Sequence, residues 1–261
     1  MRKIHPSAVI EEGAILGDEV IIEAYAYISK EAKIGNGVTI KQGARILADT
    51  TIGDFSRVFS YAIVGDIPQD ISYKEEQKTG VVIGKNSIIR EFATINSGTA
   101  KGDGFTRIGD DAFIMAYCHI AHDCILGDRV ILANNATLAG HVELGNFVVV
   151  GGLTPIHQFV KVGESAMVAG ASALSQDVVP FCLAEGNRAS IRSLNLVGIR
   201  RRFSAEEVED LNRAYKMLFR AGDLKENARA LLAQIPSENV AKMCRFILET
   251  KRGIPLHKGK G

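Results

Sequence analysis

The sequence has no long apolar segment and few cysteines, and both absences limit what the protein can be. No apolar run approaches the roughly 18 residues that a membrane-spanning helix needs, so we predict no integral membrane segment. No apolar stretch follows Arg2 and Lys3, so we expect no signal peptide and a cytoplasmic protein. The four cysteines form no CxxC pair, which argues against a redox or zinc motif. A chain of 261 residues can bury a sizeable core without disulfides.

Charge is unevenly distributed along the chain. Residues 1–186 contain 15 Lys and Arg against 22 Asp and Glu, whereas residues 187–261 contain 16 against 8. The net charge of the tail is therefore +8, which suits an acidic partner or phosphate groups. The arginines of the tail come without interleaved aromatic residues or a recognisable binding motif, so we predict no nucleic-acid partner.

An aliphatic residue recurs every six positions along most of the chain. A small residue usually follows four positions after it, as Ala26 follows Ile22, and glycine is common directly after it. The aliphatic positions are Ile4, Ile10, Leu16, Ile22, Ile28, Ile34, Ile40, Ile46, Ile52, Val58, Val64, Ile83, Ile89, Ile95, Ile108, Ile114, Ile120, Leu126, Leu132, Leu138, Leu144, Val150, Ile156, Val162, Val168 and Leu174.

A period of six fits neither an α-helix nor an ordinary alternating strand. It predicts a coil that turns a corner every six residues, so that three flat faces close a triangular prism of stacked coils. Aliphatic residues then fill the prism and small residues fit its tight corners. The pattern resembles that of hexapeptide-repeat proteins, and this resemblance implies a mainly β fold, a left-handed parallel β-helix.

The period is interrupted twice and ends near Pro180. Residues 66–80 and 99–106 are expected to leave the coil as loops, which is where binding groups tend to lie on a rigid scaffold. We predict a β-helix domain over residues 1–186 and a C-terminal α-helical domain over residues 187–261. Within the latter, Ser204 to Glu207 is a capping box, and Asp223 and Ser237 are expected to start two further helices.

Four of the six histidines cluster between residues 119 and 157. His119, His122, His141 and His157 avoid the inward positions of the repeat, so we expect them to face outward. Asp123 follows His122 and can raise its basicity and fix its tautomer. The spacing leaves three possibilities open, namely a general base, a zinc site like that of hexapeptide-repeat carbonic anhydrases, and histidines without a role.

The stretches His119 to Cys124 and Leu132 to His141 closely resemble one family, the UDP-N-acetylglucosamine acyltransferases that begin lipid A synthesis in Gram-negative bacteria. The resemblance extends over nearly the whole chain, including Ile156 to Phe159, the Gln69-Asp70 pair and the helical tail. It implies a homotrimer with active sites between neighbouring prisms, a 3-hydroxyacyl donor on acyl carrier protein, a UDP-sugar acceptor, and neither cofactor nor metal. The acidic carrier protein would then suit the basic tail.

The resemblance also implies roles for individual residues. His122 matches the general base, Asp123 its support and Gly140 the donor that stabilises the oxyanion. The other matched positions are Gln69, Asp70, His141, His157 and Gln158 for the sugar nucleotide, Asn195, Arg201 and Arg202 for its uridine and phosphate end, His119 and Asn134 for the acyl and donor side, and Gly170 for acyl length.

Two positions depart from the family pattern. Ser72 stands where better-known members have a lysine, and Val197 where they have a glutamate. Both lie in regions assigned to the sugar nucleotide, so a 3-amino acceptor that yields an amide is an alternative to the 3-hydroxyl acceptor. An acetyltransferase of the hexapeptide-repeat class and a zinc carbonic anhydrase are further alternatives.

Overall fold

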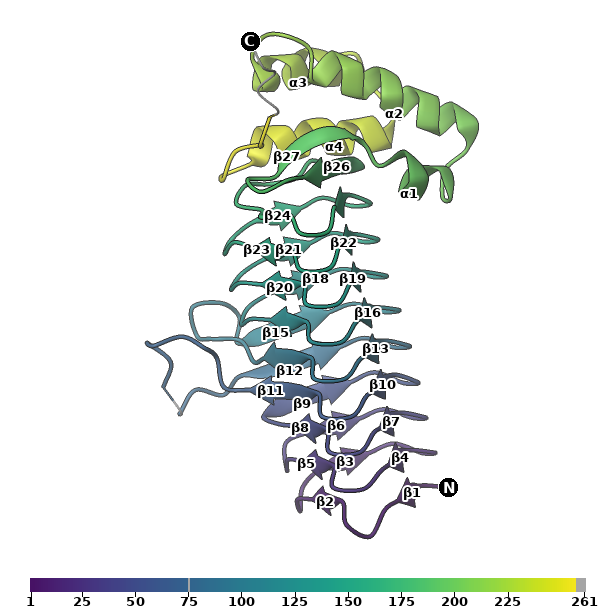
Figure 1. The fold of residues 1–261 in the computed structure, drawn as a ribbon, viewed down its shortest axis with the longest axis vertical. Coiled ribbons are helices and arrows are strands. Elements are labelled where there is room, and N and C mark those ends of the chain that lie inside the picture. Colours follow the sequence, from purple (N-terminus) through teal and green to yellow (C-terminus); the bar gives the residue numbers. More distant parts are fainter. Residues whose placement is uncertain (75, 257–261) are drawn as a thin grey trace.

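The computed structural model describes residues 1–74 and 76–256, and these form a column of stacked coils with helices at its C-terminal end (Figure 1). Three sheets of short parallel strands make up the walls of the column. The expected left-handed parallel β-helix is confirmed. No helix in the described part of the chain is long and apolar enough to cross a lipid bilayer.

Each sheet takes one strand from every coil. The first sheet contains β1 (Lys3–Ile4), β4 (Ile21–Ile22), β7 (Thr39–Ile40), β10 (Arg57–Val58), β13 (Ile88–Ile89), β16 (Phe113–Ile114), β19 (Ile131–Leu132), β22 (Val149–Val150), β25 (Met167–Val168), β26 (Cys182–Glu185) and β27 (Ser190–Leu194). The second contains β2 (Val9–Ile10), β5 (Tyr27–Ile28), β8 (Arg45–Ile46), β11 (Ile63–Asp66), β14 (Thr94–Asn96), β17 (His119–Ile120), β20 (Thr137–Leu138) and β23 (Pro155–Ile156). The third contains β3 (Ile15–Leu16), β6 (Lys33–Ile34), β9 (Asp49–Ile52), β12 (Gly80–Ile83), β15 (Phe105–Ile108), β18 (Ile125–Leu126), β21 (Glu143–Leu144) and β24 (Lys161–Val162).

One turn of the coil takes 18 residues, because Ile21 pairs with Thr39 in the next coil. The predicted aliphatic and small positions point into the prism, where Ile40, Ala44 and Leu132 are fully buried. The backbone N–H and C=O groups are paired from coil to coil, which satisfies the polar main chain along the column. Hydrophobic burial and backbone pairing therefore both favour the six-residue register.

Three columns of corner residues run along the prism. Most corners contain a residue in the left-handed region, such as Asp123 and His141, each with φ near 60°. We call the corner with residues 122–123, 140–141 and 158–159 the first corner, that with 128–129, 146–147 and 164–165 the second, and that with 116–117, 134–135, 152–153 and 170–171 the third. Residues 18 apart in sequence thus lie one above the other, and the three corners face different directions.

Both interruptions of the repeat lie between strands of neighbouring sheets. Residues 67–79 connect β11 to β12, and residues 97–104 connect β14 to β15. Asp66 and Gly80, expected in the first loop, instead belong to β11 and β12. Phe105 and Thr106, expected in the second loop, belong to β15. Because β12 pairs with β9 below and β15 above, the wall of the prism stays continuous where the loops leave it.

Up to residue 256, the C-terminal segment forms four helices, α1 (Leu196–Arg200), α2 (Ala205–Leu218), α3 (Leu224–Leu232) and α4 (Glu238–Glu249). Ser204 and Glu207 form the predicted capping box of α2, and Asp223 caps α3. The short helix α1 was not predicted. β27 also lies beyond residue 186, where it pairs antiparallel with β26 and so extends the first sheet.

The cysteines are free and buried. Cys118 and Cys124 occupy the small inward positions, and their Sγ atoms donate to the carbonyl oxygens of Ala133 and Ala139. Burial raises the pKa of Cys118 to about 11 and that of Cys124 to about 12, which keeps both as thiols at neutral pH. These two side chains therefore act as small core residues.

Candidate active site

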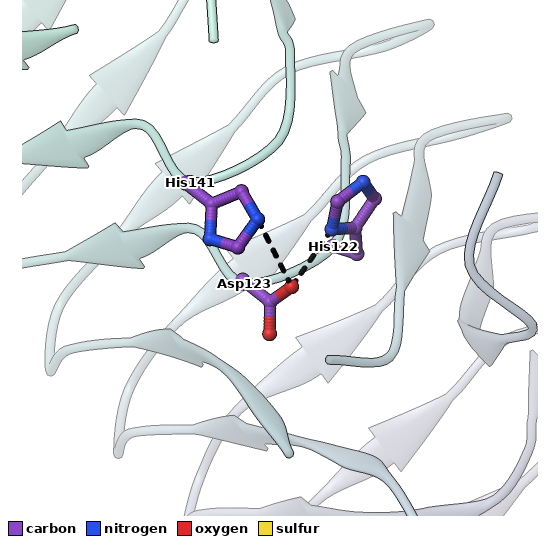
Figure 2. Close-up of side chains that lie close together, drawn as sticks. All are labelled: His122, Asp123 and His141. Atoms are coloured by element: carbon purple, nitrogen blue, oxygen red, sulfur yellow. Dashed lines mark hydrogen bonds and ion pairs between the residues drawn. The ribbon is translucent and has the colours of Figure 1, made fainter. Parts of the chain in front are cut away.

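His122, Asp123 and His141 meet at the first corner (Figure 2). The Nδ1 atom of His122 lies 2.8 Å from Oδ2 of Asp123, and Nε2 of His141 lies 3.5 Å from the same oxygen. The Asp123 side chain is only 4% exposed, against 14% for His122 and 21% for His141. The corner geometry thus buries the carboxylate and leaves the imidazoles accessible to a ligand.

The second loop holds the Asp123 carboxylate in place. The backbone N–H of Thr99 donates to Oδ1 at 2.8 Å, and the Thr99 hydroxyl donates to Oδ2 at 2.7 Å. Burial alone would raise the pKa of Asp123, but the hydrogen bonds from His122 and Thr99 outweigh it and lower the pKa below its ordinary value. Asp123 is therefore an oriented anion.

Gly140 lies directly against the His122 ring. A Cβ atom on Gly140 would approach Cε1 of His122 to 2.6 Å and Nε2 to 2.8 Å, so no side chain fits there without moving the imidazole. Gly140 is buried, and its backbone N–H finds no acceptor among the described residues. Buried backbone donors are rarely left unpaired, which makes this N–H a candidate donor to a ligand oxygen.

His141 is packed between two rings. Its imidazole stacks on Phe159 with a centroid distance of 4.6 Å and meets the His122 ring edge-on at 5.1 Å. Burial lowers the pKa of His141, and the nearby Asp123 carboxylate only partly opposes this effect. Neutral His141 can both donate and accept hydrogen bonds, as recognition of a sugar hydroxyl requires.

The same three side chains could also hold a metal ion, because their ligand atoms lie within 4.8 Å of one another. However, Oδ2 of Asp123 already accepts hydrogen bonds from Thr99 and His122. A metal ion bound by all three side chains would have to replace the His122 contact. The observed hydrogen bonding therefore suits proton transfer better than metal binding.

Asp70 is held in the first loop by groups from both loops. Its Oδ1 atom accepts from the backbone N–H and the hydroxyl of Ser72, both at 2.8 Å, and its Oδ2 atom accepts from Nζ of Lys101 at 2.8 Å. The Lys101 contact is the largest of the effects that hold the pKa of Asp70 well below its ordinary range. The neighbouring Gln69 is exposed.

The remaining predicted residues near the first corner lie on or beside the second sheet. His119 is in β17, where its Nδ1 atom lies 2.8 Å from Oγ1 of Thr94, and burial lowers its pKa. His157 follows β23 and lines a groove of about 440 Å³ together with Ala139 and Arg188. Gln158 is exposed one coil above Gly140.

Two predicted residues lie at the third corner. Asn134 and Gly170 stack in one column, with Gly152 between them. A Cβ atom on Gly170 would come no closer than 3.3 Å to another heavy atom, the carbonyl oxygen of Gly152. Within one chain these residues are therefore separated from His122 by a whole face of the prism.

Asn195 and Arg202 lie beside the second corner, and their polar groups form hydrogen bonds and an ion pair within the chain. Asn195 caps α1 through the N–H of Gly198 and donates to the carbonyl oxygen of Ser165. Arg202 contacts the Ser165 hydroxyl, pairs with Glu164 at 3.1 Å and stacks on Phe147. Arg201 is exposed. A single chain does not bring these three residues to His122.

Three further residues hold the site and were not predicted from the sequence. Thr99 and Lys101 come from the second loop, and Thr106 of β15 accepts from the backbone N–H of Asp123 at 2.9 Å. Their only signal was that the loop interrupts the repeat. No spacing rule linked them to Asp70 or Asp123.

Comparisons with known proteins agree with this fold. Residues 177–255 match a family model described as UDP N-acetylglucosamine O-acyltransferase, domain 2, and residues 105–140 match the bacterial transferase hexapeptide model. The chain is 82% identical to an acyl-(acyl-carrier-protein)–UDP-N-acetylglucosamine O-acyltransferase of Campylobacter jejuni, which covers 100% of this chain and 99% of that protein. It is 75% identical to the protein of the same name from Campylobacter concisus, over the full length of both.

Solved structures show the same relationship. The UDP-N-acetylglucosamine acyltransferase from Campylobacter jejuni superposes with a TM-score of 0.96 at 82% identity and covers 98% of this chain and 100% of that one. The Arabidopsis enzyme superposes with a TM-score of 0.82 at 32% identity, with coverage of 98% and 100%. The chain therefore belongs to the family of acyl-(acyl-carrier-protein)–UDP-N-acetylglucosamine O-acyltransferases, and it is an acyltransferase.

Proposed function

We propose that the protein transfers a 3-hydroxyacyl chain from acyl carrier protein to the 3-position of a UDP-N-acetylglucosamine-type sugar, the first step of lipid A biosynthesis, with His122 as general base. The names of the relatives supply the donor and the acceptor. The observation that carries the mechanism is the oriented His122–Asp123 pair next to the unpaired N–H of Gly140. A general base needs this combination of a fixed tautomer and an accessible second nitrogen.

The reaction follows from this arrangement. Asp123 accepts a hydrogen bond from the Nδ1–H group of His122, so the Nε2 atom, beside Gly140, is the one that can accept a proton. As Nε2 takes the proton of the 3-hydroxyl group, the oxygen attacks the thioester carbonyl. The Gly140 N–H is placed to stabilise the oxyanion. The C–S bond then breaks, and His122 returns the proton to the departing thiolate. No step requires a cofactor.

Asp70 and His141 are two of the proposed sugar-binding groups. Asp70 is held anionic and His141 has its pKa lowered, so a carboxylate and a neutral imidazole can share the hydroxyl groups of one sugar. Gln69, His157 and Gln158 are assigned to the same substrate. A 3-amino sugar, which would give an amide, remains the alternative acceptor, because both acceptors present a proton to the same Nε2 atom.

The distribution of the proposed site over three corners supports a homotrimer. Asn134 and Gly170 at the third corner, proposed for the acyl chain, and Asn195, Arg201 and Arg202, proposed for the uridine and phosphate end, can join His122 only from another copy of the chain. The third corner also carries an exposed aromatic ladder. Tyr61 stacks on Phe92 at 5.5 Å and Phe92 on Tyr117 at 5.1 Å. Exposed aromatic residues of this kind are typical of subunit interfaces.

The C-terminal helices are the proposed docking site for the acidic acyl carrier protein. Residues 187–261 have a net charge of +8, and the helices lie together at one end of the column (Figure 1). Such a concentration of one charge speeds the encounter with an oppositely charged partner. His119 and Asn134 are assigned to the side of the active site that the carrier protein would approach.

Replacement of the base tests the mechanism directly. We expect His122→Ala to lower kcat by about 10²- to 10⁴-fold, the usual contribution of a general base. The assay measures transfer from 3-hydroxyacyl carrier protein to UDP-N-acetylglucosamine by mass spectrometry. His5→Ala, an exposed histidine near the N-terminus, is the matched control. Full activity of His122→Ala would exclude the mechanism.

The acceptor is tested by competition in the same assay. UDP-N-acetylglucosamine and its 3-amino analogue compete for a set of carrier-protein thioesters, and the ester and amide products are separated by mass. A dominant ester supports the 3-hydroxyl acceptor. A dominant amide replaces it with the 3-amino sugar while leaving the roles of His122 and Gly140 intact.

A further inference from the structure

Lys101 is a charged residue that connects the two loops of the site. It lies in the second loop, and its Nζ atom donates to Oδ2 of Asp70 in the first loop at 2.8 Å. The side chain of Lys101 is 60% exposed, whereas that of Asp70 is 12% exposed. The carboxylate is therefore largely covered, and the ammonium group that covers it faces solvent.

Asp70 has a hydrogen-bond donor on each carboxylate oxygen, whereas Lys101 uses one of its three donors on Asp70. Both oxygens of Asp70 have donors, from Ser72 on one side and Lys101 on the other. An ammonium group has three N–H donors, and Asp70 takes one of them. Within residues 1–74 and 76–256, Lys101 thus presents a held cation with donors left over for a ligand oxygen.

Stability does not account for this ion pair. The ammonium group of Lys101 faces solvent, and an ion pair that is open to water on one side contributes only on the order of 0–1 kcal/mol to stability. The loops are also joined to the prism by buried contacts that do not involve Lys101. The Asn96 amide donates to the carbonyl oxygen of Ile67 at 2.8 Å, and the Ser97 hydroxyl lies 3.1 Å from that of Thr79.

The position of Lys101 indicates which part of a substrate it would meet. The backbone N–H of Lys101 donates to the hydroxyl of Thr99, and this hydroxyl in turn donates to the Asp123 carboxylate. The charges of both Lys101 and Asp70 also act on the titration of His141. Lys101 therefore lies at the end of the site where the reacting atom of the acceptor must be, and this is the sugar end of a nucleotide sugar.

We propose that Lys101 is an acceptor-binding residue, whose ammonium group is held by Asp70 and donates hydrogen bonds to oxygens of the sugar ring. This inference rests on the proposed acyl transfer to a nucleotide sugar. It predicts a contribution to binding of the sugar, separate from binding of the uridine diphosphate.

The test compares two ligands on wild type and on Lys101→Met, which keeps the length of the chain and removes the charge. We expect the dissociation constant of UDP-N-acetylglucosamine, measured by calorimetry, to rise about tenfold, equivalent to about 1.4 kcal/mol. The dissociation constant of UDP should be unchanged. The KM for the sugar nucleotide should rise in parallel, with kcat and the KM for the carrier protein nearly unchanged. Lys101→Arg should recover part of the affinity.

Lys85→Met is the matched control, since Lys85 is an exposed lysine of the coil on the column of the second corner. Equal weakening of UDP and UDP-N-acetylglucosamine would overturn the proposal in favour of a general electrostatic effect. Unchanged affinity for both would also overturn it. If the wild-type protein transfers acyl chains and Lys101→Met binds the sugar nucleotide normally, only the role of Lys101 is refuted. If the wild-type protein neither binds nor acylates the sugar nucleotide, the proposed function is refuted as well.

Discussion

Replacement of Asp123 by asparagine should reverse the tautomer of His122. In the native protein, Oδ1 of Asp123 accepts a hydrogen bond from the backbone N–H of Thr99. Oδ2 accepts hydrogen bonds from Nδ1 of His122 and from the Thr99 hydroxyl. An asparagine must keep its carbonyl oxygen toward the fixed backbone N–H. Its NH₂ group then faces His122, which can only accept at Nδ1, so the ring proton moves to Nε2.

A proton on Nε2 blocks the atom that should receive the proton of the acceptor. The size and shape of the side chain are unchanged, so the loss should appear in catalysis and not in packing. General-base catalysis contributes about 10²- to 10⁴-fold to rate, and we expect Asp123→Asn to lower kcat by an amount in this range. The dissociation constant of UDP-N-acetylglucosamine should change little.

The assay is single-turnover transfer from 3-hydroxyacyl carrier protein, together with calorimetric binding of the sugar nucleotide. Asp111→Asn is the control, because Asp111 is also a corner aspartate with positive φ and pairs with Arg129 at a different corner. If Asp123→Asn keeps kcat within about threefold of wild type, far less than the 10²- to 10⁴-fold loss expected from general-base catalysis, the carboxylate does not set the tautomer and the reasoning fails.

Two further predictions concern acyl length and acid stability. The absence of a side chain at Gly170, where an added Cβ atom would already lie 3.3 Å from the carbonyl oxygen of Gly152, predicts that Gly170→Met shortens the preferred acyl chain. The chain length is read from product masses over a series of carrier-protein thioesters, and an unchanged profile would remove this role. Because the folded-state pKa of Asp123 is below its ordinary value, the carboxylate stabilises the fold above about pH 4 and this contribution disappears as the pH falls through the folded-state pKa. Urea unfolding at fixed protein concentration should therefore show a shallower loss of stability in acid for Asp123→Asn than for wild type, and equal slopes would contradict the assignment.

The fold could be predicted from the sequence because its rule is local. Each hexad places Ile40 or Leu132 inward by the same geometry, so one period describes the whole prism. The hand of the coil does not follow from periodicity and came from resemblance. The short helix α1 was missed because five residues contain no helical period to detect.

The repeat by itself predicts the candidate site only where the site follows it, and Gln69 and Asp70 in the first loop came from resemblance. His122, Gly140 and Gln158 lie in one column because 18 residues separate each from the next. Thr99 and Lys101 could not be placed, since a loop that leaves the coil has no register. The polar groups of Asn195 and Arg202 are engaged within their own chain, which a pattern of residue types cannot reveal.

The 18-residue coil also restricts how proteins of this architecture can change in length. An insertion of six residues between His122 and Gly140 would keep every aliphatic side chain inside, yet it would turn all later residues by one face and place Gly140 at the wrong corner. Only whole coils can be added or removed there without dismantling the site. Variation in length should therefore occur in steps of 18 residues within the walls, and freely only in the loops and beyond the last coil.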